Sequence, residues 1–345
     1  MTSIARRRAA GREPREESST ITATRPLRFG VQAGPTDTPY AARRDYWREA
    51  ERLGYDWASV GDHFVANPVF GARDTDPWNE AWTTLAALAE ATDRIRLGVL
   101  VTSVGYRHPA VLAKMAATLD VICGGRLEFG LGAGYLEAEY RMYGLPFPPA
   151  SVRIAQLDEA LRVCKLLWTR ERADFAGEYF TLADAVCEPK PVQRPHPPIW
   201  LGGMGEQRTL RVVAEHADGW NAFPLPVPQL QHKLDVLRGP CDALGRDYEA
   251  IRKQVGSNVI VRADPAGVEE ELARFAAERQ LPPERARQMA TAGTPEEVAA
   301  RLAPYLGLGF DMFLLLERTP LDHETLRLFM QEVAPRLRAA AGQGG

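Results

Sequence analysis

The sequence contains few of the residues that build cross-linked or metal-bound folds. Only four of its 345 residues are cysteines, with no CxxC pair and no Cys/His cluster at zinc-ligand spacing. We therefore expect no metal, and reduced, mostly structural thiols as in cytosolic proteins. No apolar run reaches the roughly 18 residues that a membrane helix needs. The sequence thus predicts a cytoplasmic protein with no membrane partner.

A strong surplus of either charge is also missing. Lysine and arginine total 42 residues and aspartate and glutamate 45, so nothing favours nucleic acid as a partner. Residues 1–26 hold six arginines and little to bury, and no apolar segment of a signal peptide follows the arginine run. We predict a disordered tail over 1–26, one domain over 27–337 and a flexible C-terminus over 338–345.

Beyond the tail, short β-like runs alternate with amphipathic helical segments. The runs begin near residues 27, 56, 95, 127, 199, 219, 255 and 310. Such alternation predicts an α/β protein with a single (β/α)8 TIM barrel, with insertions after the fourth strand (133–198) and after the seventh (262–293). A doubly wound open sheet is the rival fold, but its GxGxxG fingerprint does not follow the first run.

Two helices carry clear end signals. Pro109 suits the first position of a helix over 109–122, which Gly124 and Gly125 end. Before the eighth strand, Thr294 and Glu297 have the spacing of a capping box.

Active sites of such barrels lie at the C-terminal ends of the strands, so the residues after each strand are the candidates. Asp62 and His63 follow the second strand and are the candidate catalytic pair, with Asp62 orienting the histidine that donates or accepts a proton. Thr102, Ser103 and Val104 end the third strand, where small and β-branched residues would let a flat ring approach. A structural Asp–His turn and a plain strand–helix loop are the alternatives.

Glycine-rich segments follow the fourth and fifth strands. Gly132, Ala133, Gly134 and Tyr135 end the fourth, where alternate glycines would leave the backbone open to a ligand. The turn Gly202-Gly203-Met204 leads toward a helix N-terminus, which suits a phosphate. Tight packing and an ordinary turn explain these segments equally well.

Several blocks in a fixed order resemble the hallmark region of luciferase-like oxidoreductases. They cover 105–115, 124–126, 130–134, 144–148, 189–193, 197–203 and 217–221, within a similarity that spans about 27–335. The block Tyr106-Arg107-His108-Pro109 and the block Gly144-Leu145-Pro146-Phe147-Pro148 are most similar to members that depend on coenzyme F420.

The resemblance implies a site. It implies a tricyclic ring over the barrel mouth, against a bulge with a non-proline cis peptide within 102–104, near Asp62-His63. It assigns 132–134 to the ring and 202–204 to the phosphate. Two positions depart from some F420-dependent dehydrogenases, since Tyr135 replaces a glutamate and Asn67 a tryptophan. These departures argue against their sugar- or alcohol-oxidising chemistry.

Three functions follow from the resemblance. The first is an F420-dependent oxidoreductase that transfers a hydride between the deazaflavin and a small organic substrate. The alternative is a two-component monooxygenase that uses FMN, and the third is a non-catalytic flavin-binding protein. His63 favours an enzyme. The expected partners are a small-molecule substrate, a reductase that supplies reduced cofactor, and a second copy of the chain in a homodimer.

Overall fold

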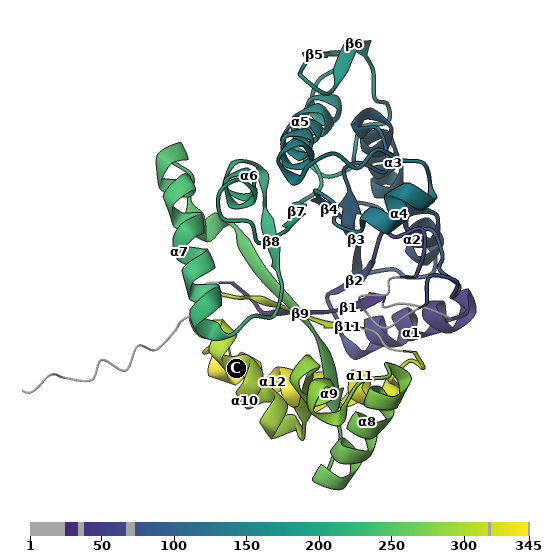
Figure 1. Cartoon of the computed structure of the whole chain (residues 1–345), viewed down its shortest axis with the longest axis vertical. Coiled ribbons are helices and arrows are strands. Elements are labelled where there is room, and N and C mark those ends of the chain that lie inside the picture. The colour runs from purple at the N-terminus through teal and green to yellow at the C-terminus, as the bar shows by residue number, and fades with distance from the viewer. Residues whose placement is uncertain (1–24, 34–37, 67–72, 317–318, 344–345) are drawn as a thin grey trace, which may run out of the picture.

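Eight parallel strands close into a barrel with the helices around it (Figure 1). The computed structural model describes residues 25–33, 38–66, 73–316 and 319–343. Neighbouring barrel strands pair in parallel, and β11 returns to β1 to complete the ring. The barrel strands are β1 (Arg28–Ala33), β2 (Trp57–Val60), β3 (Arg96–Ser103), β4 (Leu127–Gly132), β7 (Ile199–Gly202), β8 (Gly219–Ala222), β9 (Arg252–Val261) and β11 (Met312–Leu316). The predicted (β/α)8 barrel is confirmed.

The helices surround the barrel, and most of them bury their apolar faces against it. They are α1 (Tyr40–Leu53), α2 (Ala81–Glu90), α3 (Pro109–Ile122), α4 (Glu137–Met142), α5 (Ala150–Thr169), α6 (Thr209–His216), α7 (Val227–Leu244), α8 (Pro265–Glu278), α9 (Pro283–Met289), α10 (Pro295–Gly307), α11 (His323–Leu328) and α12 (Ala334–Ala340). Within the described ranges, no helix combines the length and apolar character that crossing a membrane requires.

Both insertions contain regular structure. The first holds α4, α5 and a hairpin of β5 (Ala173–Ala176) and β6 (Thr181–Ala185), which Figure 1 shows beyond the end of α5. The second holds α8, α9 and β10 (Ala290–Gly293), which pairs in parallel with the C-terminal end of β9. A small core of its own, around Phe275, supports this second segment.

A buried carboxylate ties the strands together at the N-terminal end of the barrel. Glu128 of β4 accepts hydrogen bonds from Arg28 (2.7 Å), Arg96 (2.5 Å) and the indole N–H of Trp200 (2.6 Å). Burial would raise the pKa of Glu128, but the two guanidinium groups lower it below its ordinary value. Above this layer the rings of Trp57 and Trp200 fill the barrel, with their centroids 5.1 Å apart.

Regular structure continues past residue 337, where the sequence analysis placed the end of the domain. Helix α12 runs to Ala340, and Ala341 is buried. The side chain of Gln343 accepts a hydrogen bond from the N–H of Leu27 (2.9 Å) and donates one to the carbonyl of Arg25 (2.6 Å). A single amide side chain thereby joins both ends of the folded part, a contact between distant residues that composition cannot reveal.

Candidate active site

The mouth of the barrel is open at the C-terminal ends of its strands. The strand interiors are mostly buried, whereas six barrel strands each have a partly exposed residue near the C-terminal end of their pairing within the barrel or just after it. These residues are Val101, Ala133, Gly202, Asn221, Gly256 and Leu316. A ligand at the mouth would therefore meet short side chains and exposed backbone.

A bulge in β3 directs Val101 into this mouth. The register with β4 shifts between Val99 and Thr102, and the Leu100–Val101 peptide bond is cis. The non-proline cis bond was expected within 102–104, so that position is wrong. A Cβ atom at Gly132 or Gly202 would lie 2.8 or 3.0 Å from the Val101 side chain. The two glycines therefore make room for Val101 across the ends of β4 and β7.

The three residues predicted at the end of β3 are already engaged with the protein. Thr102 accepts a hydrogen bond from the Trp82 indole of α2 (3.0 Å) and is fully buried. Val104 packs in the main apolar core, between the strands and the surrounding helices. The side chain of Ser103 shares a hydrogen bond with the hydroxyl of Tyr140. These side chains support the bulge from behind, and Val101 is the mouth residue that the sequence did not reveal.

His63 lies at the mouth between two aromatic rings. Its ring packs edge-on against Trp78 and Tyr135, with centroids 5.9 Å away in both pairs. The side chain of His63 is 15% exposed, and Tyr135 stands on the rim. His63 and Tyr135 thus lie side by side, and their catalytic and cofactor-binding roles stay predictions. Asn67 lies outside the described residues.

The carboxylate beside His63 is Glu139 of α4. Its Oε2 lies 2.9 Å from Nδ1 of His63 and also accepts a hydrogen bond from the hydroxyl of Tyr106. Burial would raise the pKa of Glu139, but hydrogen bonds from His63 and Tyr106 outweigh it and lower the pKa below its ordinary value. Burial and the neighbouring carboxylate raise the pKa of Tyr106, so its hydroxyl keeps its proton.

Asp62 does not have the role that we expected. Arg107 donates hydrogen bonds to both of its carboxylate oxygens, at 2.6 and 3.1 Å, and another to Glu80 at 2.5 Å. Glu80 in turn caps the N-terminus of α2. Burial raises the pKa of Asp62 despite Arg107. Asp62 therefore joins the end of β2 to the loop before α3, and Glu139 takes the place beside His63.

The glycine turns after β4 and β7 have conformations that favour glycine. Gly134 has a φ of +77°, and a side chain there would meet Ser103 and Tyr140. Gly203 has a φ of +127°, and its carbonyl accepts a hydrogen bond from the Trp220 indole (2.9 Å). Met204 is partly buried against the main core. The phosphate role of 202–204 stays a prediction.

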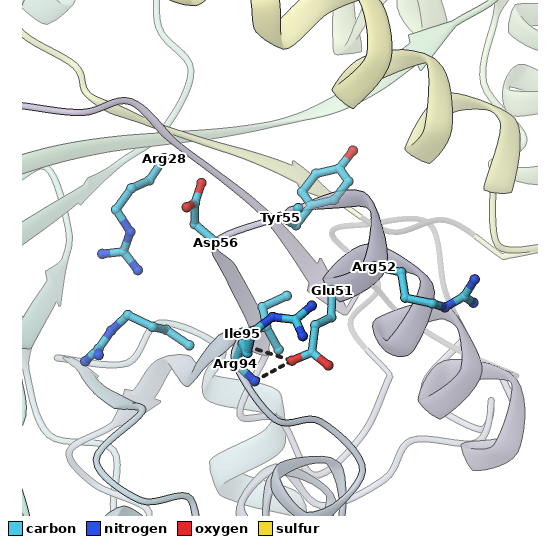
Figure 2. Close-up of a pocket in the computed structure, with 9 residues that line it drawn as sticks. Arg28, Glu51, Arg52, Tyr55, Asp56, Arg94 and Ile95 are labelled. Carbon is cyan, nitrogen blue, oxygen red and sulfur yellow. Dashed lines mark hydrogen bonds between the residues drawn. The ribbon is translucent and has the colours of Figure 1, made fainter.

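A cavity of about 370 Å³ lies at the opposite, N-terminal end of the barrel (Figure 2). Four arginines line it, but two of them, Arg28 and Arg96, already pair with the buried Glu128. Figure 2 shows Arg52 directed away from the cavity. The carboxylate of Glu51 accepts hydrogen bonds from three backbone N–H groups at residues 93–95. These contacts hold together the N-terminal end of the barrel, so we assign a structural role to this cavity and place no binding site in it.

One cluster among the described residues has the side chains of a metal site. Ligand atoms of Asp158, Glu215 and His216 lie within 4.8 Å of one another, between α5 and α6. Arg162 already pairs with Asp158 at 2.8 Å, and the Lys165 ammonium lies 3.4 Å from Nδ1 of His216. These cations satisfy the cluster, and we assign no metal to it.

Comparison with known proteins agrees with this architecture. The sequence profile of the luciferase-like monooxygenase family matches residues 24–280. An F420-dependent glucose-6-phosphate dehydrogenase of Microbacterium testaceum is 29% identical, over 91% of this chain and 98% of that protein. An FMNH(2)-dependent dimethylsulfone monooxygenase of Pseudomonas putida is 30% identical, over 64% of this chain and 62% of that protein.

Among solved structures, an F420-dependent secondary alcohol dehydrogenase superimposes with a TM-score of 0.79. Its identity is 21%, over 91% of this chain and all of that one, so this likeness shows the fold. The family profile covers well over half of the chain, and the named relatives are enzymes. The chain therefore belongs to the luciferase-like monooxygenase family and is an oxidoreductase of that class.

Proposed function

We propose that the chain is an F420-dependent oxidoreductase that transfers a hydride between the deazaflavin and a small organic substrate at the barrel mouth. The observation that carries this proposal is a partly exposed histidine, His63, held by the buried carboxylate of Glu139 where β2 ends. Such a histidine can hold or move the proton that accompanies a hydride.

The choice of cofactor rests on relatives. The F420-dependent dehydrogenases of Microbacterium testaceum, Nakamurella multipartita and Amycolatopsis mediterranei align with about nine-tenths of the chain, at 28–29% identity. The FMNH(2)-dependent relative aligns with 64% of it. If FMN is the cofactor instead, the chain is the oxygenase component of a two-component monooxygenase and needs a partner reductase.

The residues at the mouth fit a flat tricyclic ring. Val101 and the glycine-rich backbone at the ends of β4 and β7 offer an apolar surface without bulky side chains. The indole N–H of Trp78 is buried beside His63 and has no acceptor among the described residues, so it is available to a ligand oxygen. A bound deazaflavin supplies a carbon centre that accepts or donates a hydride.

We expect the purified protein to bind F420 at least ten-fold more tightly than FMN, a difference of about 1.4 kcal/mol. Titration of the protein with each cofactor, oxidised and reduced, followed by fluorescence, measures both dissociation constants. Tighter binding of FMN by ten-fold would overturn the F420 proposal in favour of the monooxygenase. Binding of either cofactor without turnover on any substrate would favour the non-catalytic flavin-binding protein.

We also propose that the chain forms a homodimer through α3. This helix exposes three large apolar side chains, Val111 (56%), Val121 (43%) and Ile122 (44%), which a second copy would cover. Sedimentation velocity should show a dimer at micromolar concentration, and Ile122→Glu should shift it toward monomer. A wild-type protein that sediments as a monomer would contradict this proposal.

A further inference from the structure

The carboxylate of Glu139 has four hydrogen-bond partners, two at each oxygen. Oε1 accepts from the backbone N–H groups of Phe64 and Val65, the second at 3.1 Å. Oε2 accepts from the hydroxyl of Tyr106 and faces Nδ1 of His63 at 2.9 Å. The side chain of Glu139 is fully buried. Each carboxylate oxygen thus has a fixed set of partners.

The direction of these hydrogen bonds fixes where the proton of His63 lies. An ionised carboxylate can only accept, and the low pKa of Glu139 keeps it ionised at neutral pH. The nitrogen that faces Oε2 must therefore carry a hydrogen. A neutral imidazole has one protonated nitrogen, so a proton on Nδ1 leaves Nε2 as an acceptor.

We infer that Glu139 is a positioning residue that sets the tautomer of His63, with the proton on Nδ1 and the lone pair on Nε2. His63 then accepts a hydrogen bond from an O–H or N–H of the bound molecule, in place of donating one to a carbonyl. In a proton transfer, the bond from that oxygen or nitrogen to hydrogen breaks and an Nε2–H bond forms. The resulting imidazolium is stabilised by Glu139. This inference rests on the proposed function only for its effect on turnover.

The substitution Glu139→Gln should reverse the tautomer. The two backbone N–H groups of Phe64 and Val65 require an acceptor, so the amide oxygen takes the place of Oε1. The amide NH2 then faces His63 and can only donate. The opposite amide orientation would leave buried N–H groups unsatisfied, at about 1–3 kcal/mol each. Nδ1 becomes the acceptor, and the proton moves to Nε2.

Nitrogen-15 NMR of protein labelled at histidine measures the tautomer without any turnover. The chain has six histidines, and the signals lost in His63→Asn identify His63. We expect a protonated Nδ1 in the wild type and a protonated Nε2 in Glu139→Gln. Tyr106→Phe removes the other partner of Oε2 and should leave Nδ1 protonated. Glu137→Gln, at an exposed position of the same helix, is the matched control.

Turnover provides the second readout. Because Glu139→Gln holds the histidine in the wrong tautomer, it should lower kcat by on the order of 10²- to 10⁴-fold. Thermal unfolding of the same variant verifies that it is folded. A wild-type spectrum with the proton on Nε2 would overturn the inference, even if Glu139→Gln failed to fold. If the tautomers are as stated but His63→Asn keeps its turnover, the role of Glu139 stands and the catalytic role of His63 fails.

Discussion

Replacement of His63 by asparagine is expected to lower kcat by roughly 10²-fold or more, the scale of general acid–base catalysis. Asparagine can still hydrogen-bond to Glu139, but it cannot take up or release a proton near neutral pH. Its side chain is smaller than that of histidine, so the substitution introduces no steric clash at the mouth. The dissociation constant of the cofactor should therefore change much less than kcat. Steady-state kinetics and a cofactor titration of the same preparation measure the two quantities.

The matched control is His232→Asn, because the side chain of His232 is 62% exposed on α7. This variant should turn over like the wild type. Nearly intact turnover in His63→Asn would mean that His63 only packs the loop after β2. A loss of cofactor affinity with normal turnover of the bound enzyme would make His63 a binding residue.

Local sequence signals predicted the framework of this site well. All eight barrel strands begin within three residues of their predicted starts, and α3 spans 109–122 as expected. The capping box of Thr294 and Glu297 is present. These features depend on neighbours in the chain, such as a proline at a first helical position or apolar residues at period two. The same signals placed His63 and Tyr135 at the mouth.

The bulge in β3 shows why the site itself was only partly predictable. In the sequence, Val99 and Val101 share a period of two and should face the same side of the strand. One irregularity between Val99 and Thr102 reverses this, so Val99 packs outward and Val101 faces inward. Nothing in the sequence marks the residue at which the register shifts.

The sequence also did not reveal which carboxylate lies beside His63. Asp62 is adjacent in the chain and was the natural candidate, yet Arg107 takes both of its oxygens. Glu139 is 76 residues away from His63, and α4 carries it there. A search for carboxylates in the first helix after the glycine turn of β4 would have found it, since the C-terminal ends of barrel strands share one face.

The bulge also makes Gly130 of β4 intolerant of any side chain. A Cβ atom at Gly130 would press on the carbonyl oxygen of Val99 and lie 3.1 Å from the carbonyl carbon. These are backbone atoms of the neighbouring strand, so they cannot move aside as a flexible side chain would. We expect Gly130→Ala to destabilise the protein by about 3 kcal/mol, at the upper end for overpacking. Its Cβ would also lie 3.3 Å from the side chain of Val101.

Chemical denaturation measures the free energy of unfolding of Gly130→Ala and of the matched control Gly239→Ala. Gly239 is exposed within α7, and a Cβ atom there would meet nothing within 4 Å. Its replacement should change the free energy of unfolding by less than about 1 kcal/mol. If Gly130→Ala unfolds at the same denaturant concentration as the wild type, the close approach of β3 and β4 at the bulge is refuted. A Gly130→Ala protein that folds but binds cofactor more weakly would indicate that displacing Val101 disturbs the mouth, because Val101 is the mouth residue among the nearest contacts of the added methyl group.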